Sequence, residues 1–491
     1  MLQFLPGDIH YSILLHATPL DVLRLRKTCR VLYTASNSRS LWIVMAKRVQ
    51  LETGYIVYNN AFDTMSGAEL EDLATSQQRI LRIICKEGPL SAGRPRKNTG
   101  PPRMTLPPIM PVRSREFPLP MLAPDEPNRW SCRWVTLLEG GRYMLAHWID
   151  LKTLTGTLHL IALPPAPSVS ALRLAAVCDM RLGRERLYDH GHWLTQEGKL
   201  QVVLVHRNAD SGSMTKLTVL ETALSPSERP FAFRRRASLT LPSTVVFERV
   251  GSNMVFWDTL TRPNRVGIWN FNTQEVLSWT IEGDTCSLAM TESALTCLFP
   301  DHVAVYAIPA PGTFSAQPQP YQPLRTVPLY PEQMKFALCA TSINTSPDGR
   351  VFFLGRHVQL RFIYALTGTA APTLSCFVRE LDFLGLHEKL TPQRYGDYLL
   401  CWAGRTDMKG VVTVGAVQLP PANCADAGEP APCYARNLKF PADVKQEGWN
   451  LDIYSGQLWM ADVGGSEGPT MVLYDYLRRP GWRPRSASHK V

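Results

Sequence analysis

The sequence predicts a multidomain α + β protein in which a few short helices precede a long all-β region, and three observations carry this prediction. Apolar residues recur at helical spacing up to about residue 88. The next stretch, 89–127, contains eleven prolines and almost no apolar periodicity, which is typical of a stiff linker. From residue 128 onward, short alternating or apolar runs separated by turn residues predict strands.

Two prolines predict the starts of the first two helices. A proline is tolerated at the first helical position, because the N–H that it lacks would be unpaired there in any case. After Pro6, Ile9 and Ile13 recur at helical spacing. Thr18 can then cap a second helix that Pro19 opens.

The second helix is expected to carry one apolar stripe and one basic side. The stripe consists of Val22, Leu25, Cys29 and Leu32, and the basic side of Arg24, Arg26, Lys27 and Arg30. A third helix is expected to begin near Ser40, with Leu41, Trp42, Met45 and Val49. Three helices in about fifty residues are near the lower limit of what one core stabilises, so some apolar surface should remain for a partner.

A set of ordered positions in this segment resembles the F-box, the short helical module that docks a substrate receptor onto the small adaptor of a cullin–RING ubiquitin ligase. The matching positions are Leu5-Pro6, Asp8-Ile9, Ile13-Leu14, Pro19-Leu20-Asp21, Leu23, Leu25, Cys29-Arg30, Leu32-Tyr33 and Leu41-Trp42. Gly7 departs from the pattern and weakens the first turn without changing its register.

The resemblance implies a set of adaptor-binding residues. They are Leu5, Pro6, Ile9, Ile13, Leu14, Pro19, Leu20, Leu23, Leu25, Leu41 and Trp42. The prolines would set the helix angles so that most of these side chains form one apolar surface. Trp42 is expected to pack chiefly inside the helical module.

A further helix is predicted from residue 66, where Ser66 and Glu69 fit a capping box. Its buried face would consist of Leu70, Leu73, Ile80, Leu81 and Ile84. The expected organisation is an F-box helical module at 1–50, an extension with one amphipathic helix at 51–88, a proline-rich linker at 89–127, an all-β, propeller-like domain at 128–476 and a basic tail at 477–491.

Groups of predicted strands recur every forty to fifty residues or so, the period of propeller blades. Two stretches, 343–354 and 264–279, resemble pieces of WD-type blades: the first contains the turn Ser346-Pro347-Asp348-Gly349, the second a strand followed by the turn Asn272-Thr273. The expected number of blades is about six to eight. A β-sandwich and an irregular barrel remain alternatives.

The net charge of +10 is concentrated at the two ends of the chain. Residues 1–50 and 477–491 each carry +5, whereas residues 128–476 sum to zero. No long basic stripe with interleaved aromatic residues is present, so a nucleic-acid surface is not favoured. The triplet Arg234-Arg235-Arg236 and the cluster Arg94, Arg96 and Lys97 are interpreted as solvated loop charges.

No sequence motif for catalysis or metal binding lies in the structural context that its chemistry requires. Gly464-Gly465-Ser466-Glu467-Gly468 matches a nucleophile elbow, but strand patterns flank it and favour a hairpin loop. His190-Gly191-His192 lacks further ligands at zinc spacing and is interpreted as a tight turn. The eleven cysteines are scattered as singles. We therefore expect reduced thiols, no catalytic residue, no metal and no cofactor.

The function that the resemblance implies is a non-catalytic substrate-recognition subunit of an SCF-type cullin–RING ligase. Its partners would be the adaptor, a cullin through that adaptor, and an unknown protein substrate recruited by the β domain. No apolar run is long enough for a signal peptide or a membrane span, so a cytoplasmic or nuclear location is expected. Two alternatives stay open: a propeller scaffold or nucleic-acid-associated protein, and a propeller enzyme with polar residues converging on a central channel.

Overall fold

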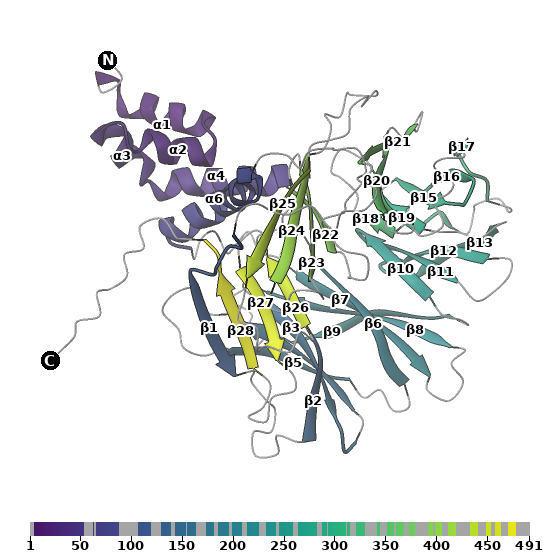
Figure 1. Cartoon of the computed structure of the whole chain (residues 1–491). Coiled ribbons are helices and arrows are strands. Elements are labelled where there is room, and N and C mark those ends of the chain that lie inside the picture. The colour runs from purple at the N-terminus through teal and green to yellow at the C-terminus, as the bar shows by residue number, and fades with distance from the viewer. Residues whose placement is uncertain are drawn as a thin grey trace.

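Helices occupy the first part of the chain and β-sheets the remainder, which confirms the predicted order (Figure 1). The structure is a computed structural model. It describes residues 4–53, 62, 65–87, 107–118, 129–138, 143–153, 155–163, 173–180, 185–195, 199–208, 214–224, 232–241, 245–258, 264–281, 287–291, 293–310, 312–314, 321–328, 341–343, 351–357, 360–367, 373–378, 391–395, 398–404, 411–418, 433–439, 448–452, 457–462 and 470–477.

The helices begin where the sequence places their caps. They are α1 (Gly7–His16), α2 (Pro19–Leu25), α3 (Arg30–Ser36), α4 (Arg39–Thr53) and α6 (Gly67–Ile84), which continues into the 3₁₀ turn η2 (Cys85–Glu87). Thr18 Oγ1 accepts a hydrogen bond from the backbone N–H of Asp21, so the predicted cap of α2 is confirmed. Ser66 and Glu69 form the capping box at the start of α6.

The expected second helix is divided into two in the structure. Helix α2 ends at Leu25, residues 26–28 form a turn, and α3 starts after Cys29. Cys29 has extended backbone angles, with φ −155° and ψ 161°, and the hydroxyl of Thr28 donates to the carbonyl of Leu25. This side-chain bond competes with the continuation of the helix. The continuous stripe predicted from Val22 to Leu32 was therefore wrong.

Twenty-eight strands of the described residues form seven four-stranded antiparallel sheets. The first three are β2 (Trp130–Leu137), β3 (Tyr143–Asp150), β4 (Gly156–Ala162) and β5 (Arg173–Met180); β6 (Glu185–Leu194), β7 (Lys199–Asn208), β8 (Thr215–Ala223) and β9 (Arg234–Leu241); and β10 (Val245–Val250), β11 (Asn253–Asp258), β12 (Asn264–Asn270) and β13 (Glu275–Ile281).

Three further sheets continue the same order of consecutive strands, and the seventh draws on both ends of the β region. They are β14 (Ser287–Met290), β15 (Ala294–Leu298), β16 (His302–Ala307) and β17 (Arg325–Pro328); β18 (Thr341–Ile343), β19 (Val351–His357), β20 (Leu360–Thr367) and β21 (Thr373–Val378); β22 (Thr391–Tyr395), β23 (Tyr398–Gly404), β24 (Val411–Gln418) and β25 (Cys433–Lys439); and β26 (Gly448–Asp452), β27 (Gln457–Asp462) and β28 (Thr470–Asp475) with β1 (Arg113–Pro118).

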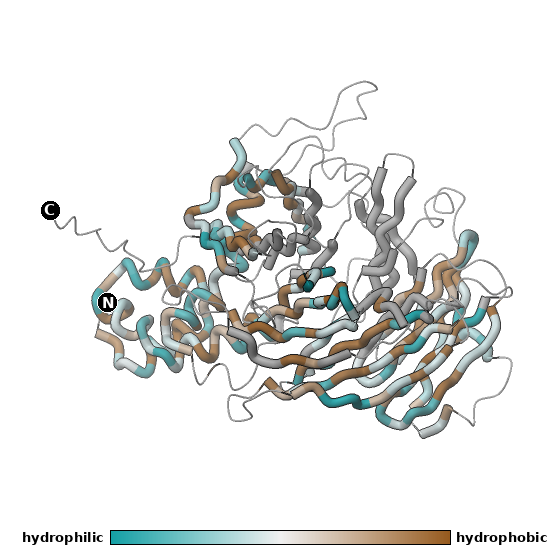
Figure 2. Tube along the Cα trace, turned by 90° about the horizontal axis from the view of Figure 1, so that it is seen from below, coloured by the Kyte–Doolittle hydropathy of each residue, from teal (hydrophilic) through white to brown (hydrophobic). Residues whose placement is uncertain are grey.

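The first strands of several sheets lie beside one another. Strand β10 contacts β14, and β14 contacts β18. Strand β26 of the last sheet contacts β2 of the first sheet, so the array returns to its beginning. Apolar cores lie between successive sheets: one cluster joins β11 and β12 to β15 and β16, and another joins β28 and β1 to β2 and β3. Figure 2 shows hydrophobic and hydrophilic residues alternating along the helices and strands.

The predicted linker at 89–127 contains a strand and is not a spacer throughout. Strand β1 pairs antiparallel with β28, from Arg113 opposite Asp475 to Pro118 opposite Thr470. Just before it, the N–H of Ile109 donates to the carbonyl of Asn437 at the outer strand β25. The β region therefore begins before residue 128, and residues 107–118 bridge two neighbouring sheets. We call this segment the strap.

Six further expectations fall on described strands or outside the described residues. His190-Gly191-His192 lies within strand β6, and the arginine triplet 234–236 lies in strand β9, so neither is the predicted turn or loop. The motif at 464–468 is outside the described residues, but its flanking strands β27 and β28 are neighbours, as a hairpin requires. The cluster at 94–97, the turn at 346–349 and the tail from 478 onward also lie outside them. Over the described residues, no helix has the length and apolar character needed to cross a membrane.

Candidate partner-binding surface on the helical module

Large apolar side chains are exposed on α1 and α3, two helices that contact each other. Just before α1, Phe4 is 79% exposed and Leu5 38%, and on α1 itself Ile9 is 42% exposed. On α3, Val31 and Tyr33 are exposed. We call these five residues the N-terminal apolar patch. Helices α1, α2 and α3 lie at the end of the molecule that points away from the sheets (Figure 1), so the sheets do not cover it.

The predicted adaptor-binding residues divide into three groups by burial. Leu5, Pro6 and Ile9 are exposed; Ile13, Leu23 and Leu25 are half-buried; and Leu14, Pro19, Leu20, Leu41 and Trp42 are buried. The expectation that Leu14, Pro19 and Leu20 present an apolar surface is therefore wrong for this conformation. Leu14 and Trp42 belong to the core that the helices share with α6, because so small a module needs these side chains for its own stability.

The buried half of the module is organised around Ser36. The carbonyl of Ser36 accepts hydrogen bonds from Trp42 Nε1 at 2.8 Å and from Arg26 Nη2 at 3.0 Å, and its hydroxyl accepts from Arg26 Nε at 2.9 Å. The guanidinium carbon of Arg26 lies 5.7 Å from the centre of the Trp42 ring. Arg26, predicted on the basic side of the second helix, thus fixes the positions of α3 and α4.

Two other arginines tie the helices together by donating to backbone carbonyls. Arg48 on α4 donates to the carbonyls of Leu15 and Ala17, where α1 ends without intrahelical partners. Arg39 at the start of α4 donates to the carbonyl of Met65 at 2.9 Å. The Arg48 bonds hold α1 against α4, so the exposed residue Ile9 is presented by a braced helix, and the Arg39 bond holds α4 against the segment that leads into α6.

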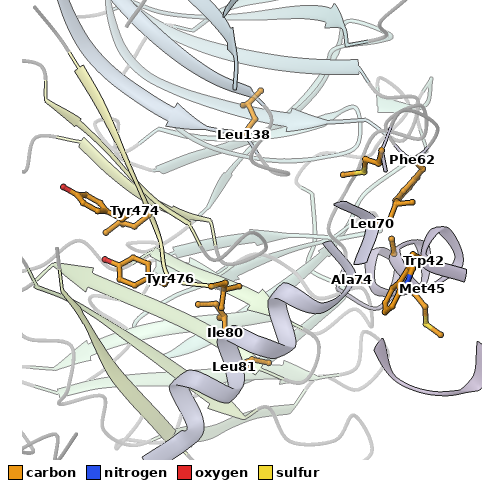
Figure 3. Packing of buried hydrophobic residues seen from close by; sticks show 14 of the residues in the cluster. Trp42, Met45, Phe62, Leu70, Ala74, Ile80, Leu81, Leu138, Tyr474 and Tyr476 are labelled. Carbon is orange, nitrogen blue, oxygen red and sulfur yellow. The ribbon is translucent and has the colours of Figure 1, made fainter. Parts of the chain in front are cut away.

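Helix α6 joins the helical module to the sheets (Figure 3). Its first half places Leu70 and Ala74 near Trp42 and Met45 of α4. Its second half places Ile80 near Tyr476, at the end of the last sheet, and the helix contacts β24 and β25. One buried cluster therefore runs from the helices into the sheets, and the predicted separation of the two units by a spacer is replaced by direct contact.

The sequence reasoning missed Phe4, Val31 and Tyr33 as exposed apolar residues. Tyr33 was among the positions that carry the resemblance, but it was not assigned to the surface. Once α3 is recognised as a separate helix with Leu32 buried, its neighbours Val31 and Tyr33 must point elsewhere. Recognising the helix break at residues 26–29 would have predicted the exposure of Val31 and Tyr33.

Acidic, histidine and cysteine side chains do not gather into a site in the described part of the chain. No group of three or more His, Cys, Asp or Glu residues there is placed to hold a metal ion. The cysteines Cys29, Cys85, Cys132 and Cys297 form no disulfide. Burial raises the pKa of the Cys85 thiol to about 11, which leaves it protonated at neutral pH and a poor nucleophile.

Comparisons with known proteins do not identify a family. No family model matches the chain, and no curated protein matches it either. Two solved structures of Hsv2 from Kluyveromyces lactis are similar, each with 10% sequence identity. The first covers 55% of this chain and 68% of its own with a TM-score of 0.30; the second covers 60% and 75% with a TM-score of 0.31. Likenesses this low carry no functional argument.

Proposed function

We propose that this chain is a substrate-recognition subunit of a cullin–RING ubiquitin ligase that docks on the adaptor through its N-terminal apolar patch. The observation that carries the proposal is the exposure of Ile9 on α1 and Tyr33 on α3, two helices braced by Arg48 and Arg26, with Leu5 exposed just before α1. Exposed apolar residues that are held in place by a rigid support are typical of interaction sites. Their position within the segment that resembles an F-box gives the expected partner.

We further propose that the seven sheets are the blades of a β-propeller. Each sheet has four antiparallel strands, and the contact of β26 with β2 brings the last sheet beside the first. In the last sheet, β1 from one end of the β region pairs with β28 from the other, a device that closes a ring without leaving a long edge. Seven lies within the number of blades expected from the sequence period.

In this proposal the receptor performs no bond chemistry. It holds a target protein on the β region while the adaptor and cullin bring charged ubiquitin close, and it acts by raising the effective concentration of a target lysine. Helix α6 matters here because it packs on both units. A fixed relation between docking surface and recruiting surface would define the space in which a target lysine can be reached.

The test is capture of the purified adaptor by the full chain and by Ile9→Asp. A charge in a docked apolar surface should reduce capture by about tenfold or more. Val276→Asp is the matched control, because Val276 on β13 is 41% exposed, against 42% for Ile9. Leu20→Ala is unsuitable because Leu20 is buried, and a loss of capture could then reflect unfolding.

Equal capture by Ile9→Asp and the unchanged chain would overturn the docking proposal. If the chain captured no adaptor but bound nucleic acid with an affinity that falls steeply as salt is added, the nucleic-acid-associated alternative would be favoured. Thermal unfolding of each variant shows whether the fold is retained.

A further inference from the structure

Strand β9 places three adjacent exposed arginines on the outermost strand of its sheet. The strand order is β6-β7-β8-β9, so one edge of β9 pairs with β8 and the other has no strand partner in the described part of the chain. Arg234, Arg235 and Arg236 are all exposed, whereas the next residue, Ala237, is buried. An unpaired edge offers a row of backbone N–H and C=O groups to an extended segment.

A register shift in β9 explains why neighbouring side chains are all exposed. Val219 lies opposite Ala237 and Leu220 opposite Arg235, so Arg236 is an extra residue in the ladder. Side chains of a regular strand alternate between its two faces, and an extra residue breaks that alternation. The irregularity therefore gathers three positive charges at one point of the edge.

These charges are not neutralised within the described residues. No ion pair joins any of the three arginines to a described acidic residue. Glu221 lies opposite Arg234 in the ladder, but its carboxylate accepts from Gln201 at 2.6 Å and pairs with Lys199 at 3.6 Å. Among the described residues, the Arg236 side chain donates to one acceptor, the amide oxygen of Asn272 on the turn between β12 and β13 of the next sheet, at 3.4 Å.

Protection of the edge against aggregation does not account for the cluster. Charged residues on an edge strand do discourage pairing with another chain. The other outermost strands, however, carry fewer basic residues: β13 and β21 have none, β5 and β17 have one each, and β25 and β1 have two each, in no case adjacent. The concentration of arginine on β9 is specific to that strand.

We infer that the free edge of β9 binds an extended acidic peptide segment of a partner protein. The segment's backbone would pair with the edge, and its carboxylates would accept from the guanidinium groups, whose planar fork matches a carboxylate. A peptide is favoured over a nucleic acid because only a peptide can complete the ladder. The inference goes beyond adaptor docking and does not depend on it, since β9 and the apolar patch are on different units.

The test measures binding of a fluorescein-labelled ten-residue peptide of alternating glutamate and threonine to the full chain. Replacing all three arginines with glutamine should weaken binding by about tenfold or more. The charge-matched control carries Arg24→Gln, Lys27→Gln and Arg30→Gln, all exposed positions on the helical module, and should bind as the unchanged chain does.

Two altered peptides separate the contributions. Glutamine in place of glutamate removes the charges, and proline in place of alternate threonines removes backbone donors; each should weaken binding. Unchanged binding by the triple variant, equal weakening by the control variant, or unchanged binding of the proline peptide would each overturn the inference. Tighter, triplet-dependent binding of a single-stranded DNA of equal charge would replace it with a nucleic-acid site.

Discussion

Arg26 and Glu71 form a two-point ion pair that joins the helical module to α6. Arg26 Nη2 lies 2.6 Å from Glu71 Oε2, and Arg26 Nη1 lies 3.1 Å from Glu71 Oε1. The two side chains are only 17% and 10% exposed. A fork-to-fork pair of this kind fixes direction as well as distance, so it holds the turn after α2 in a defined orientation against α6.

Removing this pair should destabilise the chain. We expect Glu71→Ala to lower the free energy of unfolding by about 2 kcal/mol, because hydrogen bonds to largely buried charges contribute about 1.5–3 kcal/mol. Arg24→Ala is the control, since Arg24 pairs with Asp21 in an exposed position and should cost about 0–1 kcal/mol. Chemical denaturation of both variants measures these losses. Equal losses in the free energy of unfolding would show that the buried pair contributes no more than the exposed one.

Phe117 on β1 should be essential to the last sheet. Its side chain is 2% exposed and belongs to the core between the last and first sheets. We expect Phe117→Ala to lower the free energy of unfolding by about 3–5 kcal/mol. Val112→Ala, at a strap position that is 48% exposed, should change it by less than about 0.5 kcal/mol. A mild effect at Phe117 would argue that β1 is not part of the folded core.

Gly267 should tolerate no side chain while Phe256 is present. The two residues lie directly opposite each other on β12 and β11, and a Cβ atom at Gly267 would lie 2.1 Å from Phe256 Cζ. Because Phe256 is buried, its ring has no free space, and Gly267→Ala should cost about 1–3 kcal/mol. Adding Phe256→Leu should recover part of that loss. Thermal unfolding of the single and double variants tests the coupling, which strict additivity would refute.

His206 should make stability depend on pH. Burial, together with the charge of Lys216, lowers the pKa of His206 to about 4 from its ordinary value of 6.5. Between these values the unfolded chain binds more protons, so the free energy of unfolding falls as the pH is lowered from about 6.5 to about 4, by up to about 3 kcal/mol. His206→Gln should lose much of this dependence, measured as the difference between denaturation at pH 7 and pH 4.5. The same pH dependence in both proteins would exclude His206 as its source.

Local signals in the sequence predicted the elements that depend on local contacts. Thr18 and Ser66 cap their helices as expected, because a cap needs partners only three residues away. The predicted strands at 201–206 and 411–417 lie within β7 and β24, since alternation or an apolar run is a property of the strand itself.

What escaped prediction depends on partners distant in the sequence. Strand β1 lies in a proline-rich stretch and acquires its structure from β28, more than 350 residues later. The burial of Leu20 could not be seen either, because α6 covers α2 and the sequence does not show which helices meet. The edge arginines looked like loop charges for the same reason: only the pairing of β9 with β8 makes them strand residues.

The pairing of β1 with β28 also sets an order of events during synthesis. Strand β1 leaves the ribosome more than 350 residues before its partner β28 does. Until residue 475 has emerged, β1 has no strand partner, and the core around Phe117 lacks Met471 and Leu473. Such a distant contact carries a large loop-closure entropy and forms slowly. A premature stop before β28 would therefore leave β1 unpaired and the chain prone to aggregation, even with its six other sheets complete.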